Sequence, residues 1–200
     1  MPGGRPRSFD PDAALDRALE VFWRNGYEGT SLTDLTTAMG INKPSLYAAF
    51  GNKEELFSKV LARYLEGPGA YATDALDAPT GREVVERLIH GAIDLTAGDT
   101  TPPGCLCVKT VQACAPDAHA PHEDAVKVRQ AGETALRRRL EQATDLPSHH
   151  DPAVLAALVH TISDGIAVQA AAGRSREALR QIGNSALHAL WGESADAEQR

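Results

Sequence analysis

Cys105 is the residue whose type and position most favour chemistry in this sequence. It follows Pro103 and Gly104 at the start of a short segment, ending at Pro116, that is predicted to be helical. The unpaired N–H groups and the positive end of the dipole at a helix N-terminus stabilise a thiolate. Two interpretations stay open: Cys105 is a small core residue, or it is a thiol that senses oxidants or electrophiles.

The remaining cysteines and the histidines do not have the spacing of metal ligands. Cys107 and Cys114 lie seven residues apart on one helix face, where we expect them to act as small hydrophobic residues. The histidine pairs have no third ligand at helix spacing; they are His119 with His122 and His149 with His150. We therefore predict no metal site.

An enzyme would need a base beside the thiol of Cys105. His90 and His160 are the candidates, but no spacing links either of them to Cys105. The glycine-rich loops of nucleotide sites are also absent from the sequence. The sequence therefore predicts neither an enzyme nor a cofactor.

A second set of side chains suits contact with nucleic acid, and it lies on a predicted helix at about 43–50. Its outer face carries Lys43, Ser45, Tyr47 and Ala48. Leu46 and Phe50, four residues apart, point toward a core instead. Asn42 can cap this helix, and Pro44 is tolerated because N–H groups in a first turn have no helical partner.

The helix before it begins at a capping box of Ser31 and Asp34. Its apolar stripe is Leu32, Leu35 and Met39, and Gly40 can take the left-handed backbone that ends a helix. Two short helices around such a turn predict a helix-turn-helix, whose second helix enters the major groove of DNA.

Hydroxyl and basic side chains beside these helices are candidates for phosphate contacts. Thr30 and Ser31 stand at one helix N-terminus, and Lys53 follows the cap of the next helix. Arg5 and Arg7 lie in the N-terminal stretch, which is either a disordered end or an arm that reaches DNA backbone or minor groove.

The string from GRPRSF through ALEVFWRNGYEGTSLTDLTTAMGINKPSLYAAFGNKEELF resembles the N-terminal DNA-binding domain of the TetR family of bacterial repressors. The most specific parts are G-Y-x-G-T-S and S-L-Y-x-x-F-x-N-K-E-x-L. The resemblance implies a homodimer that binds a palindromic double-stranded DNA operator and is released by a small-molecule effector. Family members often carry His or Tyr where this chain has Ala48 and Ala49, so the operator sequence does not transfer.

Composition fits such a protein once the charge is divided along the chain. The formal net charge is −7, but residues 1–63 hold eight basic and eight acidic side chains, so the acidity lies in residues 64–200. With so few cations near DNA, we expect strong salt dependence and reliance on a dimer. The sequence has three cysteines, which is an odd number, no secretory signal and no apolar run long enough to span a bilayer. These features predict a cytoplasmic protein without membrane contact.

Helical periodicity throughout predicts an all-α fold of about nine helices. We expect a DNA-binding domain at residues 8–55 and an effector-binding and dimerisation domain at residues 56–192. The breaker Gly67-Pro68-Gly69 ends the helix that joins them, and it is either a hinge or a plain loop.

The last two predicted helices carry more apolar surface than one core needs. Small residues such as Gly165 and Gly183 permit close helix approach, so we predict a four-helix dimer interface, as in the resembled family. Candidate walls of an effector pocket are Ile89, Ile93, Cys105, Val108, Val111, His160 and Asp164. The alternative function keeps the same fold but makes Cys105 a redox or electrophile sensor.

Overall fold

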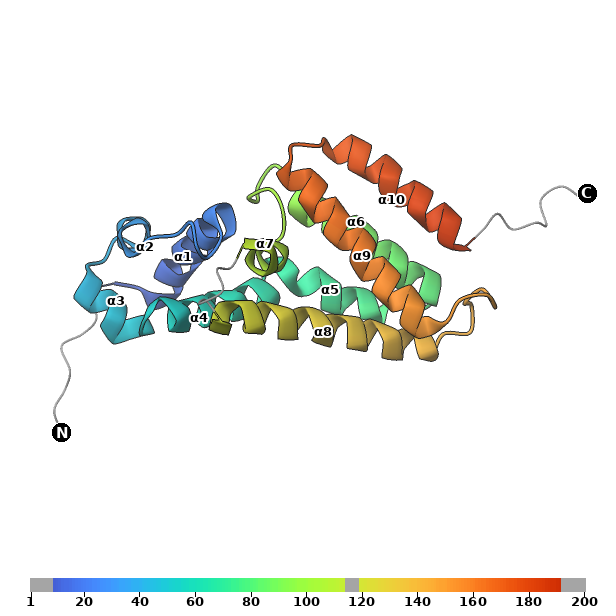
Figure 1. Cartoon of the computed structure of the whole chain (residues 1–200), viewed down its shortest axis with the longest axis horizontal. Helices are drawn as coiled ribbons and strands as arrows, with labels where there is room; N and C mark the ends of the chain where they lie inside the picture. The colour runs from blue at the N-terminus through green and yellow to red at the C-terminus, as the bar shows by residue number, and fades with distance from the viewer. Residues whose placement is uncertain (1–8, 114–118, 192–200) are drawn as a thin grey trace, which may run out of the picture.

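The computed structural model describes residues 9–113 and 119–191, which form ten α-helices and no strand (Figure 1). The N-terminal helices are α1 (Pro11–Asn25), α2 (Leu32–Met39), α3 (Lys43–Phe50) and α4 (Lys53–Glu66). The others are α5 (Tyr71–Asp74), α6 (Gly81–Thr96), α7 (Leu106–Ala113), α8 (His119–Glu141), α9 (Pro152–Ala171) and α10 (Arg176–Trp191). The all-α prediction is confirmed.

The ten helices also agree with the prediction of about nine, the short α5 being the additional one. The chain after α4 continues through consecutive helical turns. These are the 3-10 turn Pro68–Ala70, then α5, then the 3-10 turn Ala75–Asp77. Pro68 suits the first position of a helical turn, and the alanines that follow have high helix propensity.

Helices α1 to α4 share one aromatic core. Phe22 of α1 meets Phe57 of α4 edge to face with ring centroids 5.2 Å apart, and Trp23 meets Tyr64 in the same way at 5.0 Å. Leu46 of α3 is fully buried in this core. Because α4 completes the core that holds α2 and α3, α3 sits on a rigid support.

A second core lies between α6, α8, α9 and α10. Helix α6 contacts both α9 and α10, and α8 packs along α9 (Figure 1). Leu95 at the end of α6 and Leu106 and Cys107 of α7 belong instead to the N-terminal core. Helix α7 therefore joins the two halves of the molecule.

Helix α9 departs from one sequence expectation. It has 20 residues and a mean hydropathy of 1.5 over its most apolar window, enough by length and composition to cross a membrane. The expectation that no apolar run approaches this length was wrong. One such helix is weak support for a membrane span, because core helices of soluble proteins pass the same test.

Candidate DNA-binding surface and effector cavity

Helix α3 presents a polar face to solvent. Lys43, Pro44 and Ala48 are exposed, Ser45 is half-buried and Tyr47 is 49% exposed, whereas Leu46 on the opposite side has no exposed surface. The Asn42 side chain accepts a hydrogen bond from the Ser45 N–H at 2.9 Å, which caps the helix. Gly40 has φ +67°, the left-handed conformation that lets the chain turn sharply between α2 and α3. The face predicted to read DNA is therefore open and rigidly presented.

The phosphate-contact candidates beside this face differ in exposure. The Thr30 side chain is 1% exposed, and its hydroxyl donates a hydrogen bond of 2.7 Å to the Gly26 carbonyl oxygen. Thr30 therefore faces the core, contrary to the sequence prediction, because its hydroxyl pairs with the end of α1. Ser31 is exposed and exchanges hydrogen bonds with Asp34, and the Lys53 ammonium lies 4.2 Å from the ring centre of Tyr27. Arg5 and Arg7 lie outside the described residues.

The Ser31 hydroxyl and N–H, which bond the Asp34 side chain at 2.6 Å and 2.9 Å, lower the pKa of that carboxyl below its ordinary value. Asp34 therefore stays ionised while the capping box holds the start of α2. Its negative charge lies next to Ser31, whose hydroxyl and N–H both already donate to that carboxylate.

A cavity of about 440 Å³ is lined by helices α4, α5, α6, α7, α8 and α9. Its volume is in the size range of pockets that hold small organic ligands. Most of its wall is apolar and comes from Leu65, Tyr71, Leu76, Leu88, Val128, Leu136 and Val159. Arg129 of α8 forms a bidentate ion pair with Asp164 of α9 in this wall. One of its two N–O distances is 2.6 Å. The pair raises the pKa of Arg129, and burial lowers the pKa of the nearby His160, which favours its neutral form.

The cavity gathers only some of the predicted wall residues. Cys105, Val108, His160 and Asp164 line it, but Ile89, Ile93 and Val111 do not. Ile89 and Ile93 lie on the adjacent side of α6, against Gly183 of α10, where an added Cβ would lie 3.0 Å from each. Both faces of α6 are apolar, so its periodicity does not indicate which face borders the void.

The thiols of Cys105 and Cys107 are in contact at one end of the cavity. A hydrogen bond from the Cys107 thiol lowers the pKa of Cys105 to about 6, against the opposing effect of burial. The Tyr64 hydroxyl also donates to the Cys105 sulfur at 3.3 Å, and the N–H groups of Val108 and Cys107 assist at the start of α7. The same hydrogen bond, together with burial, raises the pKa of Cys107 well above its usual value. Cys114 lies outside the described residues.

Comparison with known proteins settles the family of this chain. The family model for bacterial regulatory proteins of the tetR family matches residues 14–60. The transcriptional repressor ComR of Escherichia coli K12 is 36% identical over 196 residues, which cover 95% of this chain and 92% of ComR. This chain belongs to the TetR family.

Other TetR-family proteins agree along almost the whole length. The repressor BdcR of Escherichia coli K12 is 33% identical, with 88% of this chain and 86% of BdcR covered. The structure of a cysteine mutant of the regulator CifR, complexed with 26-base-pair operator DNA, has a TM-score of 0.88 and 41% identity. That match covers 92% of this chain and 99% of CifR. The chain is therefore a DNA-binding transcription regulator with a helix-turn-helix.

Several residues around the cavity were not predicted from the sequence. Tyr64 of α4 was not singled out, yet its hydroxyl donates a hydrogen bond to the sulfur of Cys105. Arg129 was not singled out, because its partner Asp164 is 35 positions away on another helix. Asp164 and His160 are four residues apart, but Asp164 pairs with α8 instead of with His160. Sequence spacing carries no signal for such pairs between helices.

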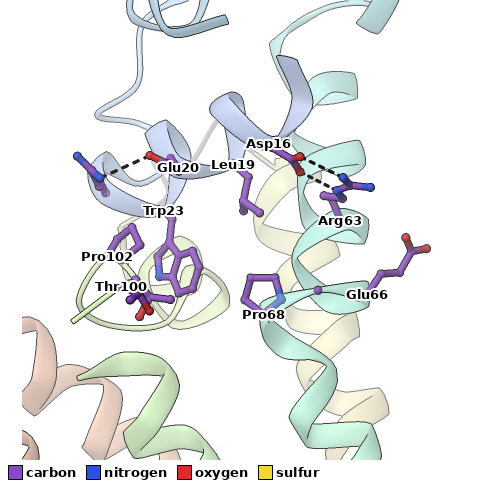
Figure 2. A pocket seen from close by; sticks show the side chains of 12 residues that line it. Asp16, Leu19, Glu20, Trp23, Arg63, Glu66, Pro68, Thr100 and Pro102 are labelled. Atoms are coloured by element: carbon purple, nitrogen blue, oxygen red, sulfur yellow. Dashed lines mark hydrogen bonds and ion pairs between the residues drawn. The ribbon is translucent and has the colours of Figure 1, made fainter. Parts of the chain in front are cut away.

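A groove of about 600 Å³ marks the seam between the N-terminal helices and the rest of the molecule. Figure 2 shows the Trp23 ring with Pro68 on one side and the loop residues Thr100 and Pro102 on the other. Arg63 of α4 binds the Asp16 carboxylate of α1 through two hydrogen bonds of 2.7 Å and 3.1 Å. This pair joins two of the N-terminal helices to each other, whereas Trp23 crosses the seam: its indole N–H donates to the Gly104 carbonyl oxygen at 2.7 Å.

Proposed function

We propose that this TetR-family chain is a homodimeric repressor that binds a palindromic operator and leaves it when a small molecule occupies the cavity. The observation that carries the proposal is the division of α3 into an exposed polar face and a buried apolar face. Tyr47 is 49% exposed beside Leu46, which has no exposed surface. A helix held in this way can enter a major groove without disturbing its own core.

In this proposal, Lys43, Ser45 and Tyr47 lie over the groove, with Pro44 and Ala48 beside them. Ser31 and Lys53 flank the groove at the starts of α2 and α4, near phosphates. Thr30 supports the turn before α2 through its buried hydrogen bond rather than touching DNA.

The dimer is proposed to form through α9 and α10. Large apolar side chains stay exposed on these helices: Val154 (64%), Leu158 (39%), Val168 (39%) and Ile182 (42%). Leu158 and Gly165 lie on the same side of α9, and a Cβ added at Gly165 would meet nothing within 4 Å. An exposed apolar strip with room for a close partner fits a four-helix interface between two copies. The same interface would cover the part of α9 that resembles a membrane span.

The effector is proposed to bind in the cavity between α4 and α9. Its occupancy would favour a dimer whose two α3 helices are wrongly spaced for neighbouring half-sites. Coupling of about 1–3 kcal/mol, typical of allosteric proteins, weakens operator affinity by about 5- to 150-fold. That range is enough for a switch.

The test uses the full chain and labelled DNA from the regions flanking its own gene. The proposal expects a protected palindrome, two protomers per DNA, and loss of protection in Tyr47→Ala without loss of helix content. Extracts of the native host, fractionated and added to the complex, should contain a small molecule that restores free DNA. Binding as a single protomer, or wild-type affinity in Tyr47→Ala, contradicts the proposal.

The thiol alternative is favoured by one observation. Cys105 lines the cavity with its pKa lowered to about 6 by the Cys107 hydrogen bond, so at neutral pH it carries a nucleophilic thiolate. A thiol sensor and a ligand-binding repressor share one fold and one operator, and they differ in whether the effector forms a covalent bond.

A further inference from the structure

The end of the cavity nearest the N-terminal core combines a nucleophile, a proton donor and an apolar binding space. Cys105 provides the nucleophile, and the neighbouring Cys107 provides the proton. We propose that Cys105 captures small neutral electrophiles of the α,β-unsaturated carbonyl class, and that the adduct acts on the DNA-binding helices through the Gly104–Trp23 hydrogen bond. This inference rests on the proposed function, since it names the chemical class of the effector.

The contacts of Cys105 distinguish it from an ordinary core cysteine. Its sulfur accepts a hydrogen bond from the Tyr64 hydroxyl, with an oxygen–sulfur distance of 3.3 Å, and another from the Cys107 thiol, and it is only partly buried. Hydrogen bonds to a thiolate favour the charged form. The cavity beside the sulfur gives a ligand of a few carbon atoms room to approach.

The charges in the wall favour a neutral ligand. The guanidinium of Arg129 already binds the carboxylate of Asp164 through two hydrogen bonds, so this pair brings no net positive charge to the cavity. The thiolate of Cys105 repels an anion, and the apolar walls oppose any ligand that carries its own charge. A neutral molecule with one carbonyl group fits both conditions.

The reaction balances without an oxidant or a cofactor. The Cys105 thiolate attacks the β-carbon, the new C–S bond forms, and the C=C electrons move to make an enolate on the carbonyl oxygen. The α-carbon then takes the Cys107 thiol proton, and Cys107 recovers a proton from water. Cys107 can release this proton because alkylation removes the thiolate hydrogen bond that had raised its pKa.

The adduct lies next to the contacts that hold α1. Gly104, the residue before Cys105, accepts the Trp23 indole N–H at 2.7 Å, and the Lys109 ammonium donates to the Trp23 carbonyl oxygen at 2.9 Å. Gly104 has φ +87°, and an added Cβ would lie 3.1 Å from both Ala171 and Lys109. Because this corner is tightly packed, we expect a new substituent on Cys105 to displace Gly104 and weaken both bonds to α1.

The experiment compares 2-cyclohexen-1-one with its saturated analogue cyclohexanone on the full chain. Wild type, Cys105→Ser and Cys107→Ser are followed by intact mass, peptide mapping, thermal melting and operator binding. The proposal expects one adduct per chain on Cys105, at least about 10-fold less adduct in Cys105→Ser, and operator release only by the unsaturated ketone. An equal rate of adduct formation in Cys105→Ser overturns it, as does an adduct on Cys105 without any loss of DNA affinity.

A second measurement needs no variant. The adduct rate on wild-type Cys105 should change by only about a tenth between pH 7 and 8.5, whereas an ordinary thiol rises about 16-fold over that range. The groups facing Cys105 are Tyr64 of α4, Tyr71 of α5, Cys107 and Lys109 of α7, and Arg129 of α8. A 16-fold rise would show that the thiol is not activated and overturn the proposal.

Two further outcomes separate this inference from the function on which it rests. Release by cyclohexanone alone, or by hydrogen peroxide but not by the unsaturated ketone, overturns electrophile capture and leaves the repressor proposal intact. If no operator is bound, the repressor proposal fails, and the mass and pH measurements still decide whether Cys105 captures the electrophile.

Discussion

Replacing Lys43 by alanine tests the predicted position of α3 on DNA. Lys43 is exposed at the first position of α3, so the change should alter the free energy of unfolding by no more than about 0.5 kcal/mol. In the proposed complex the Lys43 ammonium, at the edge of the major groove, also neutralises a backbone phosphate, so in a dimer each operator complex loses two such contacts. At about 0.9 per contact, the slope of log K against log salt becomes shallower by about 1.8, which at about 0.1 M salt corresponds to about 2.4 kcal/mol or about 60-fold in affinity.

The assay is fluorescence anisotropy of labelled operator DNA over a series of salt concentrations. Lys127→Ala is the matched control, since it removes the same charge from an exposed lysine on α8 that pairs with Glu123 at 3.5 Å. Its slope should equal that of the wild type. A Lys43→Ala slope equal to the wild type would refute the reasoning, because affinity would then not depend on a phosphate contact from this residue.

Three other changes test separate parts of the structure. Leu158→Asp places a carboxylate on the exposed strip of α9, where the carboxylates of two copies would be buried across the dimer axis without a positive partner. Light scattering should therefore report a monomer, and a persistent dimer would exclude this interface. Trp23→Phe keeps an aromatic ring but leaves the Gly104 carbonyl oxygen without its donor, so urea unfolding should show a loss of about 1–3 kcal/mol, and an unchanged midpoint would contradict the bond. Thr30→Val removes the buried hydroxyl bound to Gly26 and should cost about 1 kcal/mol in stability while operator affinity stays constant; weaker operator binding by the folded variant would restore Thr30 as a phosphate contact.

The helix-turn-helix was predictable because its signals are local. The capping box of Ser31 and Asp34 and the cap of Asn42 each act within four residues, and the structure has both. Leu46 and Phe50 are buried, as their spacing predicted. Side chains that decide where a short helix begins and ends lie in the same stretch of sequence, so reading that stretch is sufficient.

The cavity was less predictable because it depends on how separate helices pack. The apolar stripe of α6 is wide enough to face α9, α10 and the void, and only the tertiary structure places Ile89 and Ile93 away from the cavity. The pair of Arg129 and Asp164 joins positions 35 residues apart. The prediction that Thr30 contacts phosphate was wrong for a related reason. A hydroxyl near a helix N-terminus can also turn inward to a carbonyl group at the end of the preceding helix.

The position of α7 places the two ends of the cavity next to different parts of the molecule. Leu106 and Cys107 pack in the core of α1 to α4, so a change at this end reaches the N-terminal helices through direct contact. Val159 and His160, toward α9, lie on the helix that carries the exposed strip proposed for the dimer. A ligand there would act through the spacing of two protomers, whereas a group on Cys105 would act within one protomer. The two inputs are therefore not equivalent, even though they share one cavity.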